Sequence, residues 1–198
     1  SELIEAQSGS IDVAAASLQQ GDHRSNLAAR YLPTLLAALD RAEAHAADGE
    51  VGETTAARMA AAYASHTAAW DEAKARLIAW QARGLNAASG VETFYDQPTS
   101  DDVLDAIATV IWNTTIGRVH EKVLGDENLP GGIFRPGGTQ GRARTFDLLL
   151  RGRGAGNPMN LASWNPATEE SVFFDVVGTD EVESSDEDFA VSFAQALD

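Results

Sequence analysis

MAAAYASHTAAWDEAKARLIAW, residues 59–80, shows the clearest periodic pattern in the chain. Large or apolar side chains recur in it at steps of four and three residues, with Ala the most common residue between them. This spacing is typical of a helix that buries one face, and Ala is the best helix former. The recurring positions are Met59, Tyr63, His66, Trp70, Ala73, Leu77 and Trp80. We therefore predict one continuous helix with an unbroken apolar stripe, preceded by a turn at 48–52 and ended by Gly84.

Two more helices are expected before it, because the first ninety residues hold 26 of the 35 Ala. The first repeats every three or four residues at Ile4, Gln7, Ile11, Ala14 and Leu18. The second repeats at Leu27, Tyr31, Leu35, Leu39 and Ala42, with Pro33 near its start or at a kink. Residues 103–124 form a further predicted helix, apolar nearly all round, with Thr99 and Asp102 placed as a capping box and Gly125 at its end. An all-round apolar helix belongs in a core or between subunits.

The chain changes character after residue 124. Residues 125–168 are rich in Gly, Arg and Pro, with short strands expected at 133–134 and 145–150. Residues 169–198 are expected to form a strand at 171–177 and then an amphipathic segment capped by Asp186 or Asp188. We thus predict a mainly α protein: an antiparallel helical bundle over 1–124, a loop-rich, minor-β region over 125–168, and an extended C-terminal arm over 169–198.

Charge is distributed unevenly over a chain whose net charge is −16. Residues 131–153 hold five Arg and one Asp, whereas residues 169–198 hold ten acids and no base. A basic stretch therefore stands beside an acidic one. The overall acidity, with only two Lys, is typical of proteins from halophilic organisms, and Arg in place of Lys is equally expected of a GC-rich genome.

Several kinds of chemistry are excluded or disfavoured. The absence of Cys rules out disulfides, thiol catalysis and Cys-ligated metals. No Glu-x-x-His, His-Glu-x-x-His, phosphate-loop or Gly-x-Ser-x-Gly pattern occurs. We assign no catalytic, cofactor-binding or metal-binding residue and expect no cofactor. No apolar run is long enough to span a membrane and no signal peptide is recognised, so no membrane partner is expected.

Two features allow either a functional or a structural interpretation. His66 could face His45 across two antiparallel helices as a proton-transfer or ligand pair, although a histidine at the edge of the core is the expected interpretation. Together with Asp71, these two would be the candidates in a helical enzyme. The acidic stretch 180–188 lacks the pattern of a calcium loop and is predicted to be a solvated linker.

The Arg residues of the basic stretch could contact phosphates, pair with acids of the same or a neighbouring subunit, or be solvated. Because a −16 chain is repelled from nucleic acid over most of its surface, we favour pairing with protein and expect no sequence-specific nucleic acid binding. The set is Arg135, Arg142, Arg144, Arg151 and Arg153, of which the last four are predicted to bind a partner.

The C-terminal amphipathic segment has to bury its apolar side chains, because about ten residues are too few for an isolated helix. Docking in a groove of a partner and folding back on its own domain are both solutions. We predict docking, with Phe189, Phe193 and Leu197 as the anchors.

The layout of helical residues 1–124, a Gly/Arg-rich stretch at 131–156 and a C-terminal arm at 169–198 resembles the head–tail connector (adaptor) proteins of tailed viruses. The resemblance implies a non-catalytic subunit of a homo-oligomeric ring that docks on neighbouring assembly proteins such as a portal, and a virion location after assembly in the host cytoplasm. A stopper or tail terminator would fit similarly. Outside that resemblance, a cytoplasmic interaction module with an acidic-aromatic tail and a small helical-bundle enzyme are the alternatives.

Overall fold

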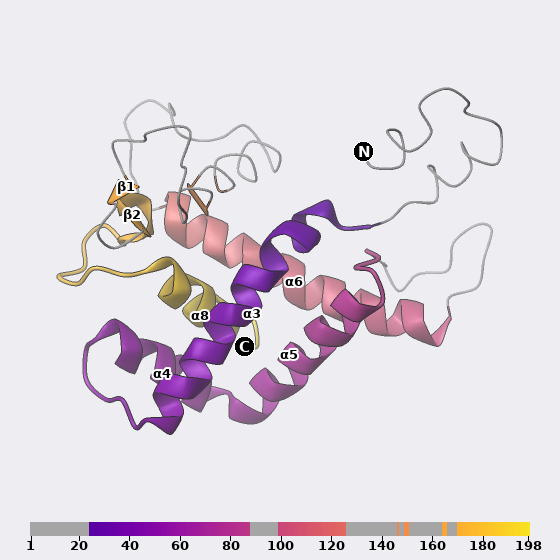
Figure 1. Ribbon diagram of the computed structural model, residues 1–198, viewed down its shortest axis with the longest axis horizontal. Helices are drawn as coiled ribbons and strands as arrows, with labels where there is room; N and C mark the ends of the chain where they lie inside the picture. The colour runs from indigo at the N-terminus through magenta and orange to yellow at the C-terminus, as the bar shows by residue number, and fades with distance from the viewer. Residues whose placement is uncertain (1–23, 88–98, 126–145, 147–148, 151–163, 166–169) are drawn as a thin grey trace.

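The computed structural model describes residues 24–87, 99–125, 146, 149–150, 164–165 and 170–198, and every structural statement below concerns these residues. They are mainly helical, as predicted (Figure 1). The helices are α3 (Asn26–Ala47), α4 (Thr55–Ser65), α5 (Thr67–Ala82), α6 (Ser100–Gly125) and α8 (Ser185–Gln195), with a 3-10 turn at Val172–Phe174. β1 (Trp164–Asn165) and β2 (Glu170–Ser171) form an antiparallel pair in which Trp164 is opposite Ser171.

Helix α3 confirms the second predicted pattern. It begins at a Ser25 cap, whose hydroxyl accepts a hydrogen bond from Ala28 N at 3.2 Å. Pro33 lies inside the helix, in its second turn. The buried face is Ala28, Tyr31, Leu32, Leu35, Ala38, Leu39 and Ala42. Helix α4 packs on this face, while α3 also contacts α5 and α8.

The single helix predicted for residues 59–80 is wrong: the structure has two helices, which meet at His66. The cause is local, because hydroxyl side chains on both sides of His66 compete with backbone N–H groups for helix carbonyls. Ser65 Oγ donates to Ala62 O at 2.8 Å, and Thr67 Oγ1 donates to Tyr63 O at 3.3 Å. The His66 backbone leaves the helical region at φ −139°, and α5 starts in a new direction (Figure 1).

The C-terminal end of α5 is fixed by contacts to two other helices. Gly84 adopts φ +99° and ends the helix as predicted, and the next residue, Leu85, is also left-handed at φ 65°. This turn brings Leu85 O within 2.8 Å of Ser25 N, so the start of α3 pairs with the end of α5. Arg83 then donates through Nε to the buried Asp105 of α6 at 2.7 Å, which joins α5 to α6.

Helix α6 has the predicted capping box, since Thr99 Oγ1 accepts from Asp102 N at 3.2 Å and Asp102 Oδ2 accepts from Thr99 N at 2.7 Å. One face is buried in the core and includes Trp112, Ile116 and Val119. The expectation that its apolar side chains are covered all round is not met by the described residues. Exposed large apolar side chains occur over its first half at Val103, Leu104, Ile107 and Val110.

The strands predicted in the C-terminal third are largely absent from the described residues. Of the predicted strand 171–177, only Ser171 belongs to β2, and the 3-10 turn follows at once because Ser171 Oγ accepts from Phe173 N at 3.4 Å. Phe146, Leu149 and Leu150, which were expected in a strand at 145–150, are helical. The helix predicted at 4–18 and the strand predicted at 133–134 lie outside the described residues.

Helix α8 lies against α3, α4 and α6 (Figure 1). It begins earlier than predicted, because its cap is Ser184, which precedes the predicted caps Asp186 and Asp188. Phe189 and Phe193 are fully buried, and the Phe193 ring meets Trp70 edge to face with 4.8 Å between ring centroids. An extended C-terminal arm is therefore not confirmed: these residues complete the core of their own chain.

Candidate functional site

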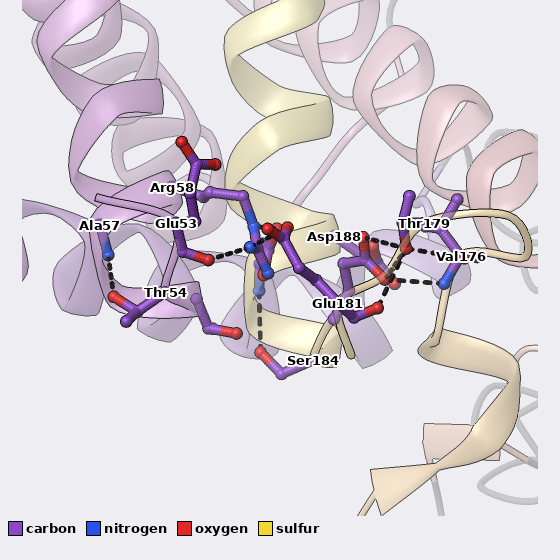
Figure 2. Close-up of polar contacts among 12 residues, drawn as sticks. Glu53, Thr54, Ala57, Arg58, Val176, Thr179, Glu181, Ser184 and Asp188 are labelled. Atoms are coloured by element: carbon purple, nitrogen blue, oxygen red, sulfur yellow. Dashed lines mark hydrogen bonds and ion pairs between the residues drawn. The ribbon is translucent and has the colours of Figure 1, made fainter. Parts of the chain in front are cut away.

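The starts of α4 and α8 lie beside each other and carry a group of charged side chains (Figure 2). Thr54 caps α4 by accepting from Ala57 N at 3.2 Å, and Ser184 caps α8 by accepting from Glu187 N at 3.3 Å. Helix N-termini stabilise negative charge, so acids are favoured at this place. We call the group of Arg58, Glu181, Glu183, Glu187 and Asp188 the charged cluster.

Arg58 of α4 is the member of the cluster that contacts both α8 and two loops (Figure 2). Its Nε donates to Glu187 Oε1 at 2.5 Å and its Nη2 to Glu187 Oε2 at 2.9 Å, a two-pronged pair. Its Nη1 donates to Glu53 O and to a Glu181 carboxylate oxygen. The hydrogen bonds that Arg58 donates to Glu187 raise the pKa of Arg58. The guanidinium thus holds α8 and two loops, 48–54 and 175–184, to α4.

Asp188 is fully buried on α8, and neither carboxylate oxygen has a hydrogen bond. The nearest cation is Lys122 of α6, whose Nζ lies 3.6 Å from Asp188 Oδ1. Burial raises the pKa of Asp188 to about 8, while Lys122 opposes the shift and the acids Glu187 and Glu183 add to it. Asp188 therefore carries its proton at neutral pH, as expected for a carboxyl removed from water without a close partner.

Glu183 closes the loop that leads into α8. Its carboxylate accepts from Val176 N at 2.9 Å and from Thr179 Oγ1 at 3.2 Å (Figure 2). Thr55 Oγ1 reaches the carbonyl of Val182 at 3.5 Å, so this loop adjoins the start of α4. Val182 itself is 74% exposed, and Val51 in the neighbouring loop is 85% exposed.

The acidic stretch 180–188 was predicted to be a solvated linker, and this is wrong for its second half. Glu183, Glu187 and Asp188 are buried, because this part of the chain caps and begins a helix that packs in the core.

Sequence reasoning missed the role of Arg58 and the start of α8. A signal was available: Ser184 followed three residues later by Glu187 is a capping-box pattern. Nothing in the pattern around Arg58, however, pointed to a partner 129 residues away.

The predicted partner-binding residues fall into two groups. Phe189 and Phe193 are occupied by the chain's own core, and Leu197 is half-buried against it, so the fold-back arrangement describes them here. Arg135, Arg142, Arg144, Arg151 and Arg153 lie outside the described residues. The structure thus places the C-terminal apolar residues in or against the core of their own chain. Their predicted contact with a partner stays a prediction.

His66 does not pair with His45; no hydrogen bond or ion pair joins these two described residues. Instead its Nδ1 lies 2.7 Å from Ser65 Oγ and its Nε2 lies 2.8 Å from Asp198 Oδ1. The third candidate, Asp71, lies near Tyr63, whose pKa is raised by partial desolvation and then by the Asp71 charge.

The Ser65–His66–Asp198 chain of contacts does not have the arrangement of a hydrolase. The serine proton is directed to Ala62 O in the last turn of α4, where the negative end of the helix dipole disfavours an oxyanion. The nitrogens are also reversed relative to the usual triad, in which Nε2 faces the serine. The chain of contacts ties residue 198 to the junction of α4 and α5.

Two general features complete the description. Among the residues that the structure describes, no three His, Asp or Glu side chains gather as metal ligands. None of the helices in the described ranges is long and apolar enough to cross a bilayer.

Compared with protein-family models, curated proteins and solved structures, the chain shows no significant match to any of them.

Proposed function

We propose that this chain is a non-catalytic subunit of a multi-subunit assembly that contacts its neighbours through an acidic edge bearing two exposed valines. The observation that carries the proposal is the exposure of Val51 and Val182 on adjoining loops fixed by Arg58. Large apolar side chains that are presented on fixed loops beside charged residues are typical of interaction surfaces. We call Val51, Val182 and the flanking acids Glu50, Glu53 and Glu181 the valine edge.

The charge of the chain suggests what the valine edge meets. Its acids carry negative charge, whereas residues 131–153 carry five Arg and one Asp. Contact between the edge of one copy and this Arg-rich stretch of the next joins two different surfaces, which is a head-to-tail contact. Repetition of a head-to-tail contact produces a closed ring or an open filament. In this proposal Arg142, Arg144, Arg151 and Arg153 pair with acids across the subunit boundary.

The most concrete form of the proposal is a head–tail connector or related neck protein of a tailed virus, with a portal as the neighbouring assembly protein and the virion as its location. This form is supported by the resemblance in layout of the helical residues 1–124 and the Gly/Arg-rich stretch 131–156, without the C-terminal arm. The ring contact is assigned to the valine edge rather than to Phe189 and Phe193, because these two side chains are used in the chain's own core. The C-terminal helix then stabilises the subunit.

The test is the native mass of the protein, by light scattering after size exclusion at ~0.15 M and ~2 M KCl, because salt screens contacts between charges. The wild type is expected to form a closed oligomer. Val51→Ser with Val182→Ser should dissociate it, and so should replacement of the four Arg by Gln. The matched control, Ile78→Ser with Val172→Ser, removes two exposed apolar side chains elsewhere and should leave the oligomer intact. A monomer of the wild type at both salt concentrations, or an oligomer indifferent to the valine and Arg changes, would contradict the proposal.

A further inference from the structure

The outward face of α6 carries a stripe that the described residues leave uncovered. Its members are spaced four, three, four and three residues apart, the spacing of a helix that packs along another helix. All five positions are exposed, whereas the opposite face packs in the core through residues such as Trp112 and Val119. No member of the stripe is charged. We call it the outer stripe: Val103, Ile107, Val110, Thr114 and Gly117.

The two halves of the outer stripe differ in the size of their side chains. The half toward the start of α6 holds large apolar side chains, and Leu104, which is 40% exposed, adjoins it. The other half is small and ends at Gly117, where a Cβ would meet no atom within 4 Å. Glycine inside a helix lowers stability relative to alanine, and close approach of another surface is a reason for its presence. The large half and the small half therefore complement each other in shape.

The charges at the two ends of α6 are complementary as well. The first turn holds the acids Asp101 and Asp102, and the exposed Arg118 follows Gly117 toward the other end. Arg118 and Asp101 take part in no ion pair of the described structure. In a two-fold contact between two copies, residue i meets residue j and residue j meets residue i. A second copy of α6 that runs in the opposite direction thus matches this helix in both size and charge.

We propose that two copies of this chain pair through their outer stripes, with the two α6 helices antiparallel about a two-fold axis near Val110. This register places Leu104 on the partner's Gly117 and Ile107 on the partner's Thr114. Each facing pair occurs twice, so a large side chain meets a small one in every layer except the central one. In the central layer, Val110 meets its own equivalent.

The same register gives the charged residues of α6 suitable neighbours. Arg118 comes to the level of the partner's first turn, which holds Asp101. Glu121, which is also exposed, comes to the level of the partner's Ser100, where the positive end of the helix dipole favours negative charge. The two helix dipoles are antiparallel, which is the favourable arrangement for neighbouring helices.

The size of the contact predicts a weak dimer. Helix α6 has 26 residues, so its outward side is about 39 Å long and about 10 Å wide and offers on the order of 400 Å² to a partner. A stable complex between separate proteins buries roughly 800 Å² on each partner. We therefore expect a dimer that forms in concentrated solution, on the order of 100 μM, and dissociates on dilution.

This pairing is independent of the proposed head-to-tail contact, because the valine edge lies on other elements. The two contacts are also compatible. A closed ring built by the head-to-tail contact would pair with a second ring through the α6 helices, which is a common form of symmetry in homo-oligomers.

The first test measures mass by sedimentation equilibrium over about 5–500 μM protein. The full chain carries Val51→Ser with Val182→Ser, so that the valine edge does not contribute. A reversible dimer is expected. Val110→Glu should raise its dissociation constant at least about tenfold, because two negative charges would meet near the axis. The matched control, Val172→Glu, changes a valine of similar exposure (58% against 64%) and should leave the dimer intact. A monomer at every concentration, or equal effects of the two changes, would overturn the proposal.

The second test uses the absence of Cys from the chain, which allows single cysteines to report the positions that meet. Val110→Cys should form an interchain disulfide about tenfold faster than Ser100→Cys or Glu121→Cys alone. In the last two variants the equivalent positions lie about 30 Å apart across the axis. A mixture of Ser100→Cys and Glu121→Cys should instead give the mixed disulfide. Equal rates at all positions, or a preference of the end positions for their own equivalents, would overturn the antiparallel pairing.

A size exchange tests the register, with helical content by circular dichroism as the check of folding. Gly117→Leu should raise the dissociation constant about tenfold, because the new side chain takes the place of the partner's Leu104. Adding Leu104→Ala should restore the dimer by making room. A dissociation constant that Gly117→Leu leaves unchanged would show that Leu104 does not lie on Gly117 and would overturn the register.

Discussion

Helices α6 and α8 pack against each other. They differ in which side chains they bury, because α8 buries polar side chains and α6 exposes apolar ones. The start of α8 buries Ser185, Glu187 and Asp188. The first half of α6 exposes apolar side chains such as Val103 and Val110. Burial of α8 is explained by contacts made elsewhere in the chain: Arg58 pairs with Glu187, and two phenylalanines anchor the helix. Exposure on α6 has no such explanation within the described residues, and it is there that a further contact is expected.

The largest expected effect comes from removing an apolar anchor of α8. Phe193→Ala should lower the free energy of unfolding by about 3–5 kcal/mol, because the ring is fully buried against Trp70 and its loss leaves a cavity. Urea unfolding followed by tryptophan fluorescence measures the change. The control, Val172→Ala, removes a 58% exposed side chain and should change stability by less than about 0.5 kcal/mol. Equal effects of the two changes would mean that α8 leaves the core in solution.

The next effect comes from removing the cation that pairs with a buried acid of α8. Arg58→Met leaves Glu187 buried without its partner, which should cost about 3 kcal/mol. The double change Arg58→Met with Glu187→Met should recover most of this loss, because no buried charge remains. Arg76→Met breaks a surface pair with Glu72 on one helix and should cost no more than about 0.5 kcal/mol. If the double variant loses as much free energy of unfolding as Arg58→Met does, the unpaired charge of Glu187 is not the cause of the loss. The charged cluster would then stabilise the protein through packing alone.

A pH-dependent effect follows from Asp188. Its pKa is raised to about 8, above the value of an unfolded chain, so its contribution to stability is complete at acid pH and is lost as pH rises toward 8. Between pH 6 and 8 the wild type should therefore lose up to about 1.4 kcal/mol per pH unit relative to Asp188→Asn. Urea unfolding of both proteins at pH 6, 7 and 8 measures the difference.

Lys122→Met sharpens this prediction. Because Lys122 lowers the pKa of Asp188, its removal should carry the pH-dependent loss of stability above pH 8. If the wild type and Asp188→Asn have parallel pH profiles, Asp188 keeps its charge in the folded protein and the burial described here is wrong.

The smallest effect concerns the exposed side of the comparison. On an uncovered helix face, Gly117→Ala should stabilise the protein by about 0.5–1 kcal/mol, since alanine is the better helix former and its Cβ meets no atom. Thermal unfolding of the wild type and of Gly117→Ala measures the gain. A loss of stability in Gly117→Ala would mean that another surface approaches the backbone of α6 closely at this position.

Sequence reasoning succeeded where the signal is local. The capping box of Thr99 and Asp102 and the turn at Gly84 depend on a few neighbouring residues, and both are present. The buried face of α3 likewise follows from its spacing. The break at His66 was also local, but the apolar stripe continues across it and hid the effect of the two flanking hydroxyls.

Sequence reasoning failed where the partner is distant along the chain. Whether an acidic stretch is solvated or buried depends on an arginine 129 positions away, and no pattern near residue 187 reports that distance. The same holds for Phe189 and Phe193: docking on a partner was predicted and folding back was the alternative, and no local pattern showed that they are buried in the chain's own core. Around the charged cluster, only the Ser184 cap of α8 could have been anticipated.

The contact between Trp70 and Phe193 has a consequence for synthesis and folding. The two rings are far apart along the chain, so the core closes late in any folding route, and long-range closure of this kind slows folding. At the usual speed of a ribosome, the residues between them take on the order of ten seconds to make. During that interval the apolar faces of α3 and α5 have no α8 to cover them. The growing chain, more than the finished protein, is then the species most prone to aggregate.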